Sequence, residues 1–132
     1  MRTLIAEDDP TCSLILTSML KPYGPTLAVA DGTSVIREFT AALVKQQPYD
    51  LVCLDIMMPE LDGQACLRCI REIERGFARE GRAGARILMI TGVAKPETIF
   101  SAFRSQCDGY LVKPVDRARF VAQLGELELT PA

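Results

Sequence analysis

Short apolar runs alternate along this chain with longer stretches in which apolar residues recur every three or four positions. The short runs are typical of β-strands, and the longer spacing is that of one face of a helix. One run is apolar at every position, which favours a strand buried on both faces. The alternation predicts a parallel sheet with helices on both of its faces. The predicted strands are Thr3–Ala6, Thr26–Ala30, Leu51–Leu54, Ile87–Ile90 and Gly109–Val112.

Caps, prolines and apolar spacing predict five helices between and after these strands. Asp9 is placed to cap the first helix, with Pro10 at its first position, and that helix is expected to end before Pro22. The second helix begins near Thr33 and stops before Pro48. The other three are expected after Asp62–Gly63, around Pro96–Glu97 and from about Asp116, the fourth ending near Cys107.

The apolar residues of each helix predict the face that packs on the sheet. In the fourth helix, Ile99, Phe100 and Phe103 are expected to face inward. The third helix keeps its apolar stripe as far as Phe77, and the charged, glycine-punctuated segment 71–86 is interpreted as a lengthened helix end and a loop. The other stripe residues are Val35, Ile36, Phe39, Leu43, Val44, Leu67, Ile70, Ile73, Phe120, Val121 and Leu124.

The composition is that of one globular domain. The chain has 132 residues, 48% of them hydrophobic and 24% charged. We expect a single domain over 1–132, with a core of about 3–125 and a short C-terminal tail. The start MRTLIAEDDP has too short an apolar stretch for a secretory signal, and no run approaches the ~20 residues of a membrane span, so a cytoplasmic location without membrane contact is expected. A net charge of −2 without a basic run argues against direct nucleic-acid binding.

The five cysteines do not indicate a disulfide framework, because their number is odd and they are scattered along the chain. Cys66 and Cys69 form a C-x-x-C, but there is no second pair, and the chain has no histidine to complete a zinc site. The same spacing also matches two positions on one helix face. Ordinary helix packing is the favoured interpretation, with metal or redox chemistry as the alternative.

Polar residues follow four of the five predicted strands. Glu7 and Asp8 follow the first, Asp55 the third, Thr91 the fourth and Lys113 the fifth. These strand ends lie at one edge of a parallel sheet, where open α/β sheets bind ligands. Singly, Thr91 satisfies a backbone group and Lys113 is an exposed lysine, but three carboxylates are costly to gather, since like charges ~4 Å apart repel by about 4 kcal/mol near a protein surface.

Such a cluster suits a hard cation, and Mg²⁺ takes carboxylates, waters and often a phosphate oxygen. A lysine and a hydroxyl beside it describe a pocket for a metal-bound phosphoryl group. The chain has neither a G-x-x-x-x-G-K-[ST] nor a G-x-G-x-x-G loop, so a bound nucleotide is not indicated. A carboxylate aimed into the pocket can itself be the nucleophile and become an aspartyl phosphate.

Four motifs, IAEDD, LDIMMPELDG, MITG and GYLVKPV, occur in the order and approximate spacing of the response-regulator receiver domain of two-component signalling, the CheY-like superfamily. The chain resembles that family from Leu4 to about Leu124. The resemblance implies a doubly wound (βα)5 fold, with a five-stranded parallel sheet in the flavodoxin-like order 2-1-3-4-5 and helices on both faces. The segment between Asp55 and Thr91 is longer than in compact members of the family.

The resemblance also implies roles for single residues. Asp55 looks like the phosphoacceptor, and Glu7 and Asp8 look like the acid pair, so Asp9 falls outside it. Asp8, Asp55 and the backbone carbonyl of Met57 would bind Mg²⁺, and Glu7 would act partly through water. Thr91 and Lys113 match the hydroxyl and the lysine that contact the phosphoryl group, and Tyr110 matches the aromatic that changes rotamer on activation. The Lys113–Pro114 bond resembles one that is usually cis in the family.

The function that follows is a phosphorylation-controlled binding module. A sensor histidine kinase or a histidine phosphotransfer protein would supply the phosphoryl group, and an unidentified protein target would bind a face made by the fourth helix, fifth strand and fifth helix. The chain itself is expected to be a monomer, or a weak dimer formed through the same face. Such a chain is not an enzyme beyond its own phosphorylation and dephosphorylation. The alternatives are an Mg²⁺-dependent phosphatase with Asp55 as nucleophile, which lacks an acid at Met57, and a flavodoxin-like mononucleotide binder, for which the acids are unsuited.

Overall fold

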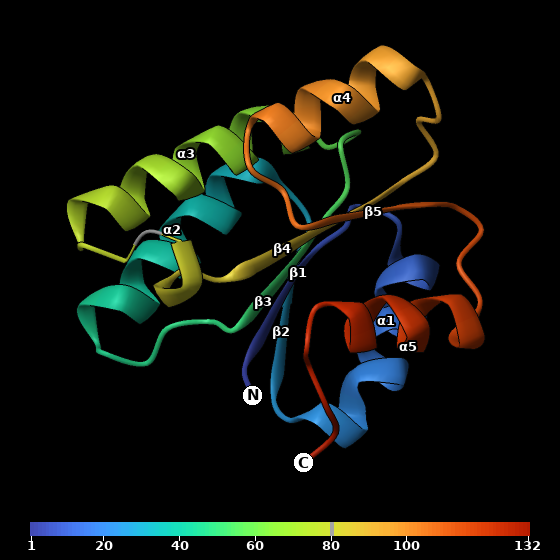
Figure 1. Cartoon of the computed structure of the whole chain (residues 1–132), viewed down its shortest axis with the longest axis horizontal. Helices are drawn as coiled ribbons and strands as arrows, with labels where there is room; N and C mark the ends of the chain where they lie inside the picture. The colour runs from blue at the N-terminus through green and yellow to red at the C-terminus, as the bar shows by residue number, and fades with distance from the viewer. Residues whose placement is uncertain (80) are drawn as a thin grey trace.

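The computed structural model describes residues 1–79 and 81–132. Within these residues, five parallel strands form one sheet in the order β2-β1-β3-β4-β5, with five α-helices on its two faces (Figure 1). The fold and the strand order predicted above are therefore confirmed. The strands are β1 (Thr3–Ala6), β2 (Thr26–Val29), β3 (Leu51–Leu54), β4 (Arg86–Thr91) and β5 (Gly109–Val112).

The helices begin close to their predicted starts. The side chain of Asp9 accepts a hydrogen bond from the amide of Thr11 and caps α1, and Asp31, Asp62 and Asp116 cap α2, α3 and α5 in the same way. The fourth helix ends earlier than expected, at Arg104. The helices are α1 (Pro10–Leu20), α2 (Gly32–Val44), α3 (Gly63–Gly76), α4 (Pro96–Arg104) and α5 (Arg117–Glu126), with short 3₁₀ turns η1 (Lys21–Tyr23) and η2 (Gly81–Ala83).

The sheet separates two hydrophobic cores. One lies under α2, α3 and α4 and includes Phe39, and the other lies under α1 and α5 and includes Phe120. β1 and β3 are buried at every position, as expected of central strands covered on both faces. No helix among the described residues is both long and apolar enough to cross a membrane.

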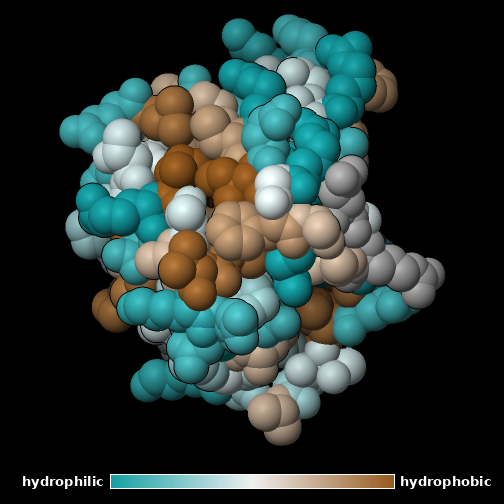
Figure 2. All heavy atoms as spheres, turned by 90° about the vertical axis from the view of Figure 1, so that its left-hand side faces the viewer, coloured by the Kyte–Doolittle hydropathy of each residue, from teal (hydrophilic) through white to brown (hydrophobic). Residues whose placement is uncertain are grey.

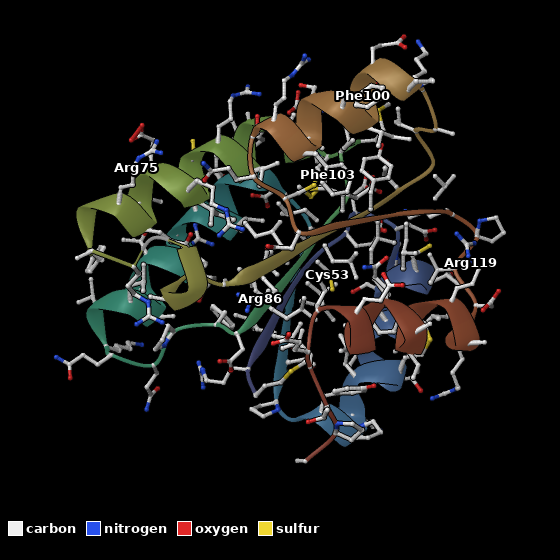
Figure 3. The ribbon with its side chains drawn as sticks, in the orientation of Figure 1. Cys53, Arg75, Arg86, Phe100, Phe103 and Arg119 are labelled. Carbon is white, nitrogen blue, oxygen red and sulfur yellow. The ribbon has the colours of Figure 1, made fainter. Side chains whose placement is uncertain are left out.

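The prediction that Phe100 and Phe103 face inward is wrong. Their exposed fractions are 67% and 46%, and Figure 3 shows both on α4. The fully buried residue of this helix is Ala102, whose small side chain lets the helix backbone lie close to the core. Three other predicted stripe residues are also exposed, namely Val44, Phe77 and Val121.

The first residues of the charged segment 71–86 form the end of α3, in line with the prediction of a helix end at this point. α3 ends at Gly76, Phe77 is its C-cap, and the chain continues through a loop that contains η2. Residue 80 of this segment lies outside the described residues. Figure 2 shows this side of the molecule, where hydrophobic residues gather among hydrophilic ones.

A buried ion pair ties α3 to the start of β4. Glu74 is 2% exposed, and its carboxylate accepts hydrogen bonds from the amide of Ala85 and from Arg71, both at 2.6 Å. The Arg71 guanidinium also donates to the carbonyl of Gln106 and to the carboxylate of Asp108. One arginine therefore joins α3, the loop before β4 and the turn before β5.

Replacing Arg71 with methionine is expected to lower the free energy of unfolding by about 3 to 5 kcal/mol, because Glu74 would be left buried without its cation. Arg75→Met is the matched control, since Arg75 pairs with Glu72 at the same 2.6 Å and the same helical spacing, but in solvent. It should cost at most about 1 kcal/mol. Urea unfolding measures both, and equal losses would contradict this account of the Arg71 network.

Candidate functional site

The sheet brings the predicted site residues to one edge. Glu7 follows β1, Asp55 follows β3, Thr91 ends β4 and Lys113 follows β5. The hydrogen-bond ladder continues into three of them, since the amides of Glu7, Asp55 and Lys113 donate to carbonyls of the neighbouring strands at 2.9 to 3.0 Å. Their backbones are thus fixed by the sheet, which limits how far the side chains can move apart.

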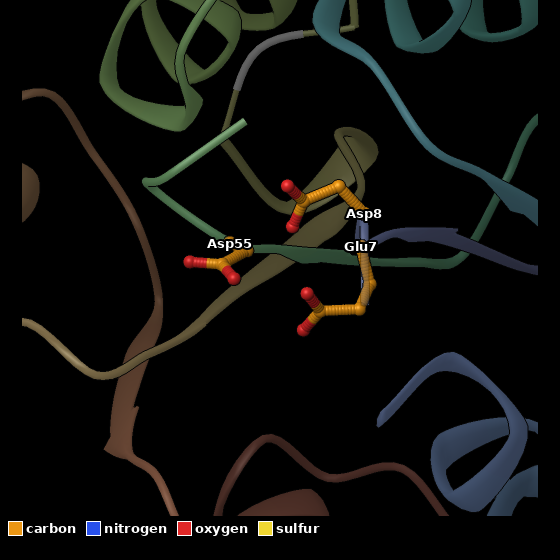
Figure 4. Close-up of side chains that lie close together, drawn as sticks. All are labelled: Glu7, Asp8 and Asp55. Atoms are coloured by element: carbon orange, nitrogen blue, oxygen red, sulfur yellow. The ribbon is translucent and has the colours of Figure 1, made fainter. Parts of the chain in front are cut away.

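Three carboxylates converge at this edge. One oxygen each of Glu7, Asp8 and Asp55 lies within 4.8 Å of the others, and Figure 4 shows the three groups facing the same space. Glu7 and Asp55 are buried, whereas Asp8 is exposed. Asp9 turns elsewhere, because its side chain caps α1. The predicted acid cluster is therefore present, with Asp9 outside it.

Lys113 supplies the cation that faces these acids. Its ammonium lies 2.5 Å from Glu7 Oε1 and 2.8 Å from Asp55 Oδ2. Although burial lowers the pKa of Lys113, its hydrogen bonds with Asp55 and then Glu7 raise it above the ordinary value for lysine. The lysine is therefore charged at neutral pH.

The two buried acids respond differently to this environment. Burial raises the pKa of Asp55, but hydrogen bonds from Lys113, Thr91 and the Met57 amide more than offset it, so the pKa lies below the usual range. For Glu7, burial raises the pKa and outweighs the hydrogen bond from Lys113, and the nearby charge of Asp55 raises it further. Of these two acids, Asp55 is therefore the one more firmly held as a carboxylate.

Thr91 and Tyr110 lie on the α4 side of the site. Thr91 is fully buried, and its hydroxyl oxygen accepts a hydrogen bond from the amide of Val93 at 3.4 Å. The Tyr110 hydroxyl donates to the carbonyl of Val93 at 2.6 Å, so the loop after β4 is bound on both sides. The Lys113–Pro114 bond is cis, as predicted.

Gly63 has a role that sequence reasoning did not assign. A Cβ at this position would overlap the carbonyl oxygen of Asp55 and lie 2.8 Å from the Cα of Ile56. The amide of Gly63 donates to the Ile56 carbonyl at 3.0 Å. Glycine therefore lets α3 start directly against the backbone of Asp55. Gly63 was visible in the sequence as part of the motif, but its contact with Asp55 requires the fold.

The C-x-x-C pair is part of the packing of α3. Cys66 is fully buried, and its thiol lies 3.6 Å from the Gly32 carbonyl oxygen and 3.7 Å from that of Leu61. Cys69 is half-buried, and both thiols are free. Among the described residues, the one group of acids, cysteines and histidines close enough to hold a metal is Glu7, Asp8 and Asp55. The helix-packing interpretation is therefore favoured.

The donor set suits a hard divalent cation. It consists of carboxylate oxygens, one of them exposed to solvent, and Mg²⁺ binds through one or two carboxylates while it keeps several waters. Three negative charges and one positive charge leave a formal charge of −2 at the site, which a divalent ion would balance. The residues present therefore fit Mg²⁺.

The sequence model of the response regulator receiver domain matches residues 3–125. The chain belongs to this family. It is 32% identical over 127 residues to the DNA-binding dual master transcriptional regulator RpaA of Synechocystis sp., which covers 96% of this chain and 48% of RpaA. It spans 12% to 23% of several other regulators and sensor proteins that it matches. The chain thus corresponds to one part of these relatives.

Solved structures agree with this assignment. A chain of the CheX–CheY complex with beryllofluoride and Mg²⁺ from Borrelia burgdorferi is 26% identical, with a TM-score of 0.81 over 98% of this chain and 90% of that one. The receiver domain of a sensor histidine kinase from Pseudomonas aeruginosa PAO1 is 28% identical, with a TM-score of 0.75 over 95% and 94%. Both chains share the fold described here over nearly their whole length.

Lys113→Met is expected to raise the pKa of Asp55, because burial remains while the main opposing hydrogen bond is lost. A depressed carboxyl pKa stabilises the fold above the unfolded value, about 4, and that contribution is lost as the pH falls. The stability deficit of the variant should therefore be largest near pH 7 and shrink toward pH 3. Urea unfolding at both pH values measures it, with Lys95→Met as an exposed control. A stability deficit that grows on acidification would refute the claim that Lys113 lowers the pKa of Asp55.

Proposed function

We propose that this chain accepts a phosphoryl group on Asp55, in the presence of Mg²⁺, from a phospho-histidine of a partner protein. The observation that carries the proposal is the convergence of Glu7, Asp8, Asp55 and Lys113 at one sheet edge in a member of the receiver family. A receiver domain is in this view a switch, and it catalyses at most its own phosphorylation and dephosphorylation.

Asp55 acts as the nucleophile. An oxygen of its carboxylate forms a bond with phosphorus while the bond between phosphorus and the donor's imidazole nitrogen breaks, and the electron pair of that bond stays on the nitrogen. Oδ1 of Asp55 is oriented by the Met57 amide at 3.1 Å and Oδ2 by Lys113 at 2.8 Å. Lys113 then remains as a positive charge beside the transferred group, which carries about 1.5 to 2 negative charges.

Asp8, Asp55 and the backbone carbonyl of Met57 would hold Mg²⁺, with Glu7 acting partly through water. Held there, Mg²⁺ would supply positive charge against the negative charge that develops on the phosphoryl oxygens. The related receiver domain from Pseudomonas aeruginosa has a magnesium ion coordinated in its active site cleft, which supports a similar site here. The exposed Asp8 lies where a partly hydrated ion can reach it.

The partner that supplies the phosphoryl group is a sensor histidine kinase or a histidine phosphotransfer protein. This chain contains no histidine, so it cannot be the phospho-histidine donor. A phosphatase function is less well supported, because the residue two positions after Asp55 is Met57, whose side chain cannot transfer a proton. Its side chain is 67% exposed at the rim of the site.

The response to phosphorylation involves Thr91 and Tyr110. The Thr91 hydroxyl would turn to the phosphoryl group, and the Tyr110 hydroxyl is bound to the same loop through Val93. This loop leads into α4, which carries the exposed Phe100 and Phe103. The face formed by α4, β5 and α5 would then present a changed surface to a protein target, or to a second copy in a weak dimer.

Asp55→Asn is expected to abolish labelling by acetyl phosphate, because the amide keeps the shape of the carboxylate but is a poor nucleophile. Asp9→Asn, which changes a nearby acid in the same way, should be labelled to the wild-type extent. Intact-protein mass spectrometry measures both. Labelling of the Asp55 variant at the wild-type level on another residue would disprove the assignment.

Asp8→Ala is expected to weaken Mg²⁺ binding far more than Asp9→Ala, since only Asp8 belongs to the carboxylate cluster. Removal of a direct ligand should raise the Mg²⁺ dissociation constant by at least about tenfold. Amide chemical shifts followed during an Mg²⁺ titration give both constants. Equal losses in the two variants would mean that the acid pair is misassigned.

A further inference from the structure

The loop between β3 and α3, residues 55–62, carries both Asp55 and Met57, yet little within the loop fixes its outer half. Its internal backbone hydrogen bonds are short-range, from the Met58 amide to Ile56 and from the Leu61 amide to Pro59, and the one to the Asp55 side chain comes from the Met57 amide. Glu60 adopts a left-handed φ of 69°, which a non-glycine residue keeps only where its surroundings impose it. The outer half of the loop therefore depends on contacts from elsewhere in the chain.

Gly32, at the start of α2, provides one of these contacts. A Cβ at this position would overlap the carbonyl oxygen of Leu61 and lie 2.5 Å from its Cβ. The Gly32 amide donates to the carbonyl of Pro59 at 3.4 Å. The φ of Gly32 is not in the left-handed region, so glycine is required here by space and not by backbone conformation. The N-terminus of α2 thus lies directly against the loop.

Thr33 and Cys66 make further contacts between the β3–α3 loop and the two helices α2 and α3. The Thr33 hydroxyl lies 2.7 Å from Glu60 Oε2 and holds that carboxylate to α2. The Cys66 thiol, in the first turn of α3, lies near the carbonyl oxygens of both Gly32 and Leu61. Burial raises the pKa of Cys66 to about 12, so the thiol keeps its proton as a weak donor at neutral pH. The start of α2, the first turn of α3 and the outer half of the β3–α3 loop are therefore in contact with one another.

We propose that Gly32 and Cys66 are positioning residues for the Mg²⁺ site: they hold the β3–α3 loop where the Met57 carbonyl can serve as a ligand. This inference rests on the proposed function, but concerns residues on α2 and α3 that touch neither the metal nor the phosphoryl group. It also gives the cysteine of the C-x-x-C pair a role other than metal binding. Displacement of the loop should then weaken Mg²⁺ binding although every ligand is still present.

The test is Mg²⁺ affinity, measured by amide shifts in the folded protein, for the wild type and Gly32→Ala. We expect the dissociation constant to rise about tenfold, the size of effect seen when support for a metal ligand is lost. Gly125→Ala is the matched control, because it also places a methyl group on a helix but meets nothing within 4 Å. It should bind Mg²⁺ within twofold of the wild type.

Two further variants separate positioning from stability and replace Gly32→Ala should it fail to fold. Cys66→Ala is expected to weaken Mg²⁺ binding severalfold, and Cys66→Ser, which keeps a donor, should restore most of it. Wild-type affinity in folded Gly32→Ala, or in Cys66→Ala, would overturn the inference while the proposed function stands. A wild-type protein that binds no Mg²⁺ would overturn both.

Discussion

The ammonium group of Lys113 allows two buried carboxylates to lie side by side at the carboxyl edge of this sheet. Lys113 Nζ contacts carboxylates from two other strand ends, Glu7 and Asp55, which at a separation of ~4 Å would repel each other by about 4 kcal/mol near a protein surface. The lysine can do so because β5 is paired with β4 up to the residue before the site, which fixes its backbone. The register of the four parallel strand pairs thus determines how far apart the charged groups at the strand ends lie.

The same charge arrangement separates two tasks within the site. Asp55 and Lys113, which under the proposed function carry out and stabilise the transfer, directly follow β3 and β5, and their amides still donate to carbonyls of the neighbouring strands. The loop after Thr91 carries the groups that would change, and the loop after Asp55 carries the Met57 carbonyl. A rigid nucleophile beside loops held by a few contacts is an arrangement that permits both accurate chemistry and a conformational response.

The sequence was sufficient to predict the elements and the acid cluster because both depend on local signals. Asp9 and Pro10 mark a helix start, and a carboxylate that ends a buried strand is conspicuous wherever it occurs. Phe100 was misplaced because hydrophobicity was given more weight than the helical spacing of Ala102, the residue that packs on the core. The need for glycine at Gly32 and Gly63 was not predicted. At each position a Cβ would overlap a backbone segment that only folding brings close. Such steric requirements leave no local pattern.

The burial of the thiols has a consequence for how motions of this molecule can be observed. Burial raises the pKa of Cys53 and Cys66 to about 12 and that of Cys107 to about 11, so almost none of these groups is a reactive thiolate at neutral pH. A thiol reagent can modify them only when the surrounding structure opens. Cys53 lies in the central strand β3 (Figure 3), Cys66 lies in α3 where it contacts the start of α2 and the β3–α3 loop, and Cys107 lies in the turn after α4. Their modification rates would therefore report the opening of three different regions, without any label having to be introduced into the chain.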